Sequence, residues 1–462
     1  MAKKKQIELT IEEKLQNALV PKEEQPYKIP NNWCWTRLEF LSNIINGDRG
    51  KNYPSKKDYV KSGVPFITAG NIEKNNTLNK EKLNYILEDK YNILRSGKIV
   101  KDDILYCLRG TLGKNAIIDF EFKGAIASSL CIVRLLNKIN KKYIYLCLNS
   151  MLIEHQMIEF NNGTAQPNLS AESLKRYKIP LPPIDEQQRI VNRIESLFTK
   201  LDKAKELIEN TLAQFEQNKM AILHKAFTGE LTVKWRKENN IDLSSWQNYQ
   251  LKDICEKITD GTHQTPKYTD DGGYIFLSSK NVKSGKIDWK NIKYIPKDLH
   301  DILYERIAPQ RDDILLAKNG TTGVAAIVDR DIIFDIYVSL ALLRVNKKYI
   351  LPMFLLYVIG SPRIKNYFDS NLKGIGVPNL HLKYIREATI SVPTIEEQQE
   401  IVNILDNLLA KYNKIKNLEQ QLEKIELLKK AILAKAFRGE LGTNNPDEES
   451  AENLLKEILA EK

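Results

Sequence analysis

The sequence predicts an α+β protein in which two pseudo-symmetric mixed α/β domains are separated by two long antiparallel coiled-coil helices. Three observations lead to this fold class. The chain of 462 residues repeats itself after about 210 residues, each copy begins with short β-rich segments, and each copy ends in a long stretch with heptad spacing. A repeat this long indicates duplicated domains rather than a solenoid of short units.

The repeat consists of short motifs that recur in the same order. Residues 163–188 (GTAQPNLSAESLKRYKIPLPPIDEQQ) correspond to residues 374–399 (GIGVPNLHLKYIREATISVPTIEEQQ). The motif Lys-Ala-Phe-x-Gly-Glu-Leu also occurs twice, at 225–231 and at 435–441. From these landmarks we expect an N-terminal helical segment (1–32), a first domain (33–183), a central helix (184–231), a second domain (232–393), a C-terminal helix (394–441) and a tail helix (442–462).

Each domain is predicted to contain a small, largely antiparallel sheet with helices between the strands. Runs such as 64–68 and 116–118 are rich in β-branched and aromatic residues and are bounded by Gly, Asn and Asp, which is typical of strands. Helical stretches are expected at 142–158 and 348–368. A mixed α/β architecture follows for both copies.

The two long helices are predicted from apolar residues that step along the chain in fours and threes. Pro183 and Pro393 stand before these runs, and Gly229 and Gly439 end them. The second run slips its register after Ile415. Two independent helical linkers would leave both apolar stripes exposed, so antiparallel pairing is favoured. The residues expected at the helix and partner interface are Ile190, Ile194, Leu197, Leu201, Ile208, Phe215, Ile401, Leu405, Leu408, Tyr412, Leu422 and Ile425.

Composition and charge narrow the functional classes. Seventy Lys and Arg against fifty-nine Asp and Glu give a net charge of +11, which favours a polyanionic partner, either nucleic acid or a membrane surface. No stretch of apolar residues is long enough to span a bilayer, and the basic start is not followed by the apolar core of a signal peptide. The five cysteines form no Cys-x-x-Cys pair and are expected to be reduced and buried. A cytoplasmic protein with no membrane partner is predicted.

Catalytic motifs are largely missing from the sequence. It contains no GxxxxGK[ST] phosphate loop, no HExxH and no Asn-Pro-Pro-Tyr-like tetrapeptide for base methylation. A chain that is not an enzyme and has no metal site is therefore expected. One alternative stays open, because Asp119, Glu121 and Lys123 together would suit a metal-dependent nuclease. The second copy has no lysine at the matching place.

Candidate DNA-binding residues lie in loops between the repeated motifs. The motifs recur, but the loops differ: RGKNYPSKKDY in the first copy is replaced by THQTPKYTDD in the second. Two similar scaffolds with different loops suit two different half-sites, although each of these residues alone would also suit a solvated surface. The candidates are Arg49, Lys51, Lys56, Lys57, Asn71, Arg109, Thr111, Lys114, His263, Gln264, Lys267, Asn281, Lys318, Asn319 and Thr321.

Several of these motifs, taken in order, resemble the specificity (S) subunit of type I restriction–modification systems, and the resemblance covers nearly the whole chain. They are PYKIP at 26–30 with Trp33, Gly-Thr-x-Gly at 110–113 and 320–323, Pro-Asn-Leu at 167–169 and 378–380, PPIDEQQ at 182–188, TIEEQQ at 394–399, the two Lys-Ala-Phe-x-Gly-Glu-Leu ends and the tail 447–455.

The resemblance implies a DNA sequence-specificity subunit with two target-recognition domains, each reading one half of a bipartite, asymmetric target. The antiparallel helices would fix the spacer and dock two adenine methyltransferase (M) subunits, to which restriction (R) subunits attach. No cofactor is expected on this chain, because S-adenosylmethionine, ATP and Mg would bind the partner subunits. The alternatives are a DNA endonuclease acting on its own and a coiled-coil scaffold that binds only proteins.

Overall fold

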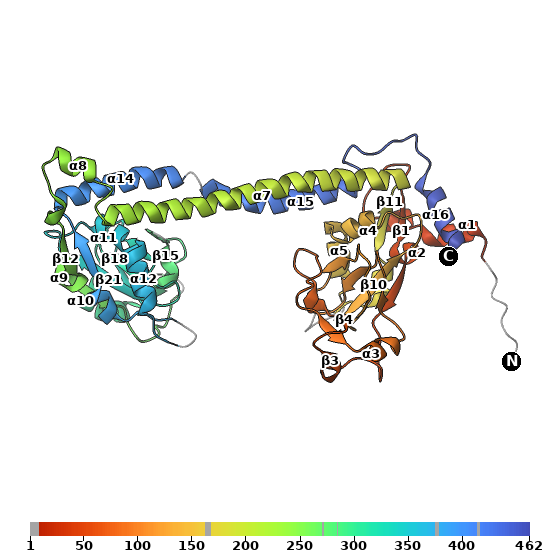
Figure 1. The fold of residues 1–462 in the computed structure, drawn as a ribbon, viewed down its shortest axis with the longest axis horizontal. Coiled ribbons are helices and arrows are strands. Elements are labelled where there is room, and N and C mark those ends of the chain that lie inside the picture. The colour runs from red at the N-terminus through yellow and green to blue at the C-terminus, as the bar shows by residue number, and fades with distance from the viewer. Residues whose placement is uncertain (1–8, 162–167, 270–271, 284, 375–377, 414–415) are drawn as a thin grey trace. The chain divides into compact units, whose positions relative to one another are not determined.

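The computed structural model describes residues 9–161, 168–269, 272–283, 285–374, 378–413 and 416–462 (Figure 1). The chain divides into two compact units. Unit 1 consists of Met1–Glu206 and Gln421–Lys462, and unit 2 consists of Leu207–Gln420. None of the described helices combines the length and the hydropathy that crossing a membrane requires.

The described part of unit 1 contains two larger sheets that share a core, and a two-stranded antiparallel sheet of β1 (Cys34–Arg37) and β11 (Lys178–Leu181). The four-stranded sheet has the order β2 (Ser42–Asn46), β10 (Leu130–Leu135), β7 (Ile104–Cys107), β8 (Asn115–Ile117), with every neighbouring pair antiparallel. The five-stranded sheet has the order β3 (Tyr59–Val60), β5 (Asn84–Ile86), β4 (Val64–Ile67), β9 (Gly124–Ile126), β6 (Lys98–Ile99). In this second sheet β4 and β9 run parallel, and the other pairs are antiparallel.

The four-stranded sheet is the middle layer of unit 1, because successive residues of a strand face opposite sides. In β7, Leu105 shares a core with Ile67 and Ile126 of the five-stranded sheet. Its neighbour Tyr106 belongs instead to the core formed with the helices, including Ile190 of α7 (Ile184–Phe227). All these side chains are almost fully buried. Strand β7 is therefore apolar throughout, as a strand covered on both faces must be.

Unit 2 repeats this topology. Its four-stranded sheet has the order β13 (Cys255–Asp260), β21 (Leu340–Val345), β18 (Ile314–Ala317), β19 (Ala325–Ile327), again antiparallel. The described strands of the second sheet are β17 (Lys293–Ile295), β14 (Tyr274–Leu277) and β20 (Phe334–Ile336), with β14 and β20 parallel. The predicted duplication and the predicted mixed α/β fold class are confirmed.

Further elements surround these sheets. In unit 1 they are α1 (Ile11–Ala18), η1 (Lys22–Glu24), β1 (Cys34–Arg37), α2 (Leu38–Leu41), η2 (Lys56–Asp58), η3 (Ala69–Asn71), α3 (Glu88–Asn92), α4 (Lys141–Leu148), α5 (Met151–Glu159), α6 (Ala171–Lys175), β11 (Lys178–Leu181) and α16 (Ala451–Glu461). In unit 2 they are α8 (Val233–Glu238), η4 (Leu243–Ser245), β12 (Gln247–Gln250), α9 (Leu251–Ile254), η5 (Ser279–Asn281), β15 (Val282–Lys283), β16 (Lys286–Ile287), α10 (Lys297–Ile307), α11 (Pro352–Ile359), α12 (Pro362–Ser370), α13 (Leu382–Glu387) and β22 (Thr389–Val392).

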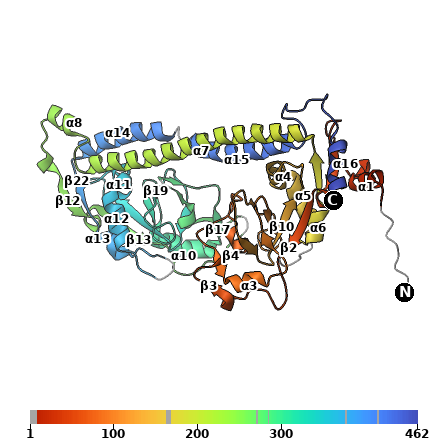
Figure 2. The same ribbon diagram turned by 45° about the vertical axis from the view of Figure 1, so that its right-hand side comes forward.

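The long helices form an antiparallel pair within each unit. Helix α7 (Ile184–Phe227) begins in unit 1, where it pairs with α15 (Lys416–Ala436). Two ion pairs join these helices, Asp202–Lys429 (2.5 Å) and Lys205–Glu426 (3.1 Å). Moving forward by three residues along α7 moves the partner back by three residues along α15, so the two helices run in opposite directions. In unit 2 the end of α7 lies beside α14 (Ile395–Asn413), as Figures 1 and 2 show.

The predicted interface side chains of these helices are all at least half-buried where the structure describes them. Those almost fully buried are Ile190, Ile194, Ile401, Leu405 and Ile425. Those half-buried are Leu197, Leu201, Ile208, Phe215, Leu408 and Leu422. The side chain of Tyr412 and the register slip at Ile415 lie outside the described residues. A role of any of these positions in binding a partner subunit stays a prediction.

The repeated Glu-Gln-Gln motif fixes each long helix to its domain. The side chain of Gln187 accepts from the backbone N–H of Asn140 at 2.9 Å and donates to the carbonyl of Pro182 at 3.0 Å. Gln398 does the same with the N–H of Leu351 (2.8 Å) and the carbonyl of Pro393 (2.9 Å). Both glutamines are fully buried. Because a buried amide must be hydrogen-bonded, this part of the motif is structural.

The glutamate of the same motif binds a side chain of the segment that follows the other long helix. Glu186 accepts from Trp33 at 2.7 Å and from Asn444, which follows α15, at 2.8 Å. Glu397 accepts from Trp246 at 3.0 Å and forms a 2.6 Å ion pair with Arg236, which follows α7. Each unit is therefore completed by residues that lie far away in the sequence.

Candidate nucleic-acid interface

The predicted DNA-binding loops of unit 1 leave the four-stranded sheet at one edge. Strands β2 and β7 are both antiparallel to β10, so they are parallel to each other and end at the same edge. The loop 47–58 follows β2, and the Gly-Thr turn 108–114 follows β7. The η3 turn joins them there, because the Ala69 N–H donates to Ser129, whose carbonyl also accepts from Leu108. We call these three segments, with Asn168, loop edge 1.

Loop edge 2 of unit 2 is built in the same way from residues 261–269, the η5 turn and the Gly-Thr turn 318–324, with Asn379. Strands β13 and β18 both pair antiparallel with β21 and end at its first residues. The Ser279 N–H donates to the Ser339 hydroxyl, and the Ser339 carbonyl accepts from Lys318. The two copies therefore share one backbone framework for their loops.

A glycine at the start of each loop allows strand β2 or β13 to approach the end of the second sheet. A Cβ on Gly261 would lie 2.0 Å from the carbonyl oxygen of Ile336, and one on Gly47 would lie 2.8 Å from that of Ala127. These neighbours are backbone atoms, which have little room to move. The loops can leave the sheet at this point only because no side chain is present.

We predict that Gly261→Ala destabilises unit 2 by at least about 1–3 kcal/mol, the usual cost of overpacking. Thermal unfolding of the full chain measures the effect. Gly70→Ala is the matched control, because its Cβ would meet the Thr68 hydroxyl at an ordinary 3.6 Å. Equal melting temperatures for both variants would contradict the close-approach argument.

The candidate side chains of loop edge 1 are mostly basic and mostly exposed. Those exposed to solvent are Arg49, Lys51, Lys56, Lys57, Arg109 and Thr111. Lys114 is half-buried, and its ammonium group donates to the carbonyl of Ile72 at 3.1 Å. The nearby acid Asp48 is buried and accepts from the backbone N–H groups of Arg49 (2.7 Å) and Arg95 (2.8 Å). The Asp48 carboxylate therefore holds the backbone of the loop in place through these two hydrogen bonds.

A second acid of this edge, Asp58, is also occupied locally. Hydrogen bonds from the side chain and the backbone of Ser55, with a further contribution from Lys90, lower the pKa of the Asp58 carboxyl group. Asp58 accepts from the Ser55 N–H at 2.7 Å and lies 3.4 Å from Lys90. The carboxylate thus shapes the short η2 helix and leaves Lys56 and Lys57 exposed to solvent.

Loop edge 2 is polar but much less basic. Its exposed candidates are His263, Gln264, Lys267 and Thr321, and Asn319 is half-buried. The candidate Lys318 is buried, with its ammonium group 2.5 Å from Asp260, so its charge is neutralised inside the protein. Because the ion pair removes this lysine from solvent, we assign it a positioning role and leave it out of the proposed DNA surface.

The candidates Asn71 and Asn281 also hold turns. The side-chain oxygen of Asn71 accepts from the Thr68 N–H at 2.8 Å, and its amide group donates to Lys82 at 2.6 Å. Asn281 accepts from the Ser278 N–H at 3.0 Å and donates to Asn291 at 2.8 Å. Both side chains are at most 5% exposed. They position the η3 and η5 turns and are likewise left out of the DNA surface.

Sequence reasoning missed two pairs of residues at these edges. Tyr53 packs edge-on against Phe66 with centroids 5.8 Å apart, and Tyr268 packs in the same way against Phe276 at 6.2 Å. Each tyrosine anchors its loop to the second sheet. Asn168 forms a backbone β-bridge with Arg109, and Asn379 forms one with Asn319. Both asparagines belong to the repeated Pro-Asn-Leu motif, so the repeat could have pointed to them.

The residues proposed for a nuclease do not form a metal site. The Lys123 ammonium group bonds to Glu88 at 2.6 Å, and Glu121, which is almost fully exposed, lies 3.8 Å from Lys101. Among the described residues, no three His, Cys, Asp or Glu side chains are grouped to hold a metal. All five cysteines are free, and burial raises the pKa of the Cys107 thiol to about 12. Nothing in the structure supports the nuclease alternative.

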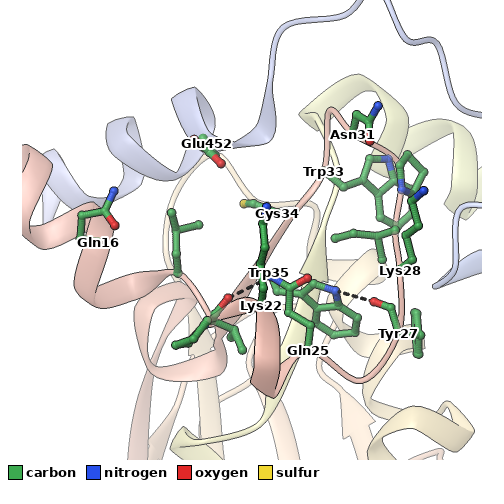
Figure 3. A pocket seen from close by; sticks show the side chains of 15 residues that line it. Gln16, Lys22, Gln25, Tyr27, Lys28, Asn31, Trp33, Cys34, Trp35 and Glu452 are labelled. Carbon is green, nitrogen blue, oxygen red and sulfur yellow. Dashed lines mark hydrogen bonds between the residues drawn. The ribbon is translucent and has the colours of Figure 1, made fainter.

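A groove of about 950 Å³ lies elsewhere in unit 1, between the segment 19–35 and α16 (Figure 3). Hydrogen bonds from Gln25 to the Val20 carbonyl and from Trp35 to the Tyr27 carbonyl order its wall. Its lining contains one carboxylate, Glu452, and no histidine. It therefore holds neither a pair of carboxylates nor a carboxylate with a histidine.

The chain is similar in sequence to a known protein family and to several known proteins. Residues 30–214 and 244–427 each match the family model described as the type I restriction modification DNA specificity domain. The chain is 27% identical to the specificity subunit of the type I restriction enzyme EcoBI of Escherichia coli, over 94% of this chain and 93% of that protein. It is 26% identical to the EcoKI specificity subunit of Escherichia coli K12, over 94% and 96%.

Two solved structures have the same fold. One, from a study of complex assembly and conformational transition of the type I R-M system, has a TM-score of 0.69 at 20% identity. The other, the HsdS subunit of Thermoanaerobacter tengcongensis, has a TM-score of 0.52 at 19% identity. Each match covers 90% of this chain and 100% of the other. Because the family model matches most of the chain in two copies, this protein belongs to the DNA specificity subunits of type I restriction–modification systems.

Proposed function

We propose that loop edges 1 and 2 each contact one half of a bipartite, asymmetric DNA target. The observation that carries this proposal is that both units have the same backbone framework and different exposed side chains. Strand ends, turns and buried asparagines recur at matching places. The side chains differ: loop edge 1 exposes Arg49, Lys51 and Arg109, whereas loop edge 2 exposes His263 and Gln264 and has the half-buried Asn319 in place of Arg109. Duplicated scaffolds with different loops suit two different DNA sequences.

The two edges are expected to bind DNA through different balances of forces. Loop edge 1 carries several exposed basic side chains, which suit phosphate groups. Loop edge 2 exposes mainly neutral polar groups, which suit base edges. Loop edge 1 then supplies more of the salt-dependent affinity, and loop edge 2 relies more on direct hydrogen bonds.

We further propose that this chain acts without chemistry of its own, as the recognition subunit of a larger complex. The antiparallel helices α7, α14 and α15 would dock two adenine methyltransferase subunits and set the spacer between half-sites. Restriction subunits would join that assembly. S-adenosylmethionine, ATP and Mg would then bind the partner subunits, and the complex would work on DNA in the cytoplasm.

The test is to map modified adenines in the source genome by single-molecule sequencing, with and without this gene. A split motif that is methylated on both strands and lost on deletion is the expected result. Methylation that persists unchanged after deletion would overturn the proposal. The endonuclease alternative instead predicts DNA cleavage by the isolated chain with Mg²⁺, abolished by Lys123→Ala.

We predict that Lys51→Gln, Lys56→Gln and Lys57→Gln together weaken DNA binding and flatten its salt dependence. The slope of log affinity against log salt should fall by about 0.9 for each lysine that contacts a phosphate. Fluorescence anisotropy with a duplex at several salt concentrations measures it. The exposed lysines Lys22, Lys200 and Lys203, changed together, are the matched control. A scaffold that binds only proteins predicts no slope to lose.

A further inference from the structure

We propose that the first side chain of each Gly-Thr turn reads one base pair, with Arg109 recognising guanine in one half-site and Asn319 recognising adenine in the other. The inference rests on the proposed DNA-binding function and goes beyond it, because it separates base-reading residues from phosphate-contacting ones. The two positions are equivalent in the repeat, and the turns that hold them are nearly superposable in their hydrogen bonding.

The hydrogen bonds of the two turns match one by one. The Cys107 N–H donates to the Lys114 carbonyl at 2.8 Å, and the Ala317 N–H donates to the Val324 carbonyl at 2.8 Å. The Leu169 N–H donates to Leu108 at 2.9 Å, and the Leu380 N–H to Lys318 at 2.8 Å. The glycines also match: φ is 82° at Gly110 and 78° at Gly320, and 79° at Gly113 and 81° at Gly323.

This rigid framework fixes the position of the variable side chain. Residue 108 or 318, which precedes it, is buried in both copies, as Leu108 in the apolar core and as Lys318 in the ion pair with Asp260. The residue that follows is a glycine, and a Cβ on Gly110 would meet nothing within 4 Å. A DNA base edge can therefore approach the turn closely.

The chemistry at the variable position differs in a way that DNA bases distinguish. An arginine guanidinium donates two hydrogen bonds to O6 and N7 of guanine, and an asparagine amide pairs with N6 and N7 of adenine. Arg109 is exposed, and its guanidinium has no hydrogen-bond or salt-bridge partner among the described residues. It is free to meet a base, unlike Lys114 of the same turn, which bonds to the Ile72 carbonyl.

Two unsatisfied acceptors support the assignment in loop edge 2. The side-chain oxygens of Asn319 and of its bridge neighbour Asn379 are buried and have no hydrogen-bond partner among the residues that the structure describes. A buried acceptor left unpaired is unfavourable, so a rotation of the amide that meets an external donor is favourable. The exocyclic amine of adenine is such a donor. In loop edge 1 the equivalent pair is Arg109 with Asn168.

The experiment selects duplexes from a randomised double-stranded DNA library with the full chain, purified together with the methyltransferase subunits of its own system. Sequencing the bound DNA should give two half-site motifs. Arg109→Asn should change one position of one half-site from guanine to adenine. Asn319→Arg should change one position of the other half-site from adenine to guanine. All other positions should stay as they are.

Lys237→Asn, on the exposed face of α8 and outside both loop edges, is the control and should leave both motifs unchanged. Asn319→Ala covers the case in which the arginine variant does not fold. With folding verified by thermal unfolding, it should lose about 5- to 150-fold of the discrimination at that position.

The outcomes separate the inference from the function on which it rests. A wild-type complex that selects no motif would overturn both. A clear wild-type motif that Arg109→Asn and Asn319→Ala leave intact would overturn the base-reading roles alone. A uniform loss of affinity, with the base preferences retained, would also overturn them and identify Arg109 and Asn319 as phosphate contacts.

Discussion

Arg236→Ala is expected to destabilise unit 2 by about 3–5 kcal/mol, because it leaves the buried carboxylate of Glu397 without its cation. The Arg236 side chain is 8% exposed and that of Glu397 is fully buried, with 2.6 Å between their charged groups. Arg236 also donates to the carbonyl of Gly229, just after the end of α7, at 2.6 Å, so the variant loses this hydrogen bond as well. Chemical denaturation of the full chain, followed by tryptophan fluorescence, measures the loss.

A double-mutant cycle separates the ion pair from general packing. Glu397→Gln removes the charge but keeps one side-chain oxygen, which can accept from Trp246 or from Thr232 and not from both. The double variant Arg236→Ala with Glu397→Gln should therefore be more stable than Arg236→Ala alone, because no unpaired charge is left buried. Lys237→Ala, on the exposed face of the same helix, is the control and should have little effect. A cycle in which the two changes add without coupling would contradict the argument.

Removing residues 442–462 is expected to unfold much of unit 1 while unit 2 keeps its structure. The deletion takes away Leu455, Ile458 and Leu459 of α16, each at most 4% exposed and part of the unit 1 core. Burying three such side chains contributes roughly 5–9 kcal/mol, which is comparable with the stability of a whole domain. Glu186 would also lose the hydrogen bond from Asn444.

Limited proteolysis with mass spectrometry tests this prediction. New cleavage sites should appear within 33–183 and not within 246–393. Glu457→Gln is the control, because it removes only the exposed contact to Lys138 and should leave the cleavage pattern unchanged. If the truncated chain protects both units equally, the tail contributes less to the unit 1 core than its burial implies.

The fold followed from the sequence where the signal is local. The Gly-Thr turns need glycines at positive φ, and the long helices need apolar residues at heptad spacing; both patterns can be read without knowing any distant contact. Each of these patterns occurs in both copies of the repeat, so the duplication and the mixed α/β class were predicted correctly. The long helices were located in the same way, although the register of the second one at Ile415 lies outside the described residues.

The candidate site followed only in part. The sequence placed the candidate residues in loops between the repeated motifs, but only the strand pairing of the structure shows that these loops leave one edge of each four-stranded sheet. The exposed basic residues of loop edge 1 could be named from their type. Asn71, Asn281 and Lys318 could not be separated from them, because polar residues in a loop look the same whether they face solvent or hold a turn.

What the sequence determined by itself is therefore the scaffold: two copies, their turns and their long helices, each specified by neighbours a few residues apart. What only the tertiary structure decided is which polar groups are free. Lys318 is neutralised by Asp260, 58 residues away, and Glu186 is satisfied by Asn444, 258 residues away. Burial and pairing depend on such distant partners, and a polar side chain becomes available to DNA only when the fold leaves it without one.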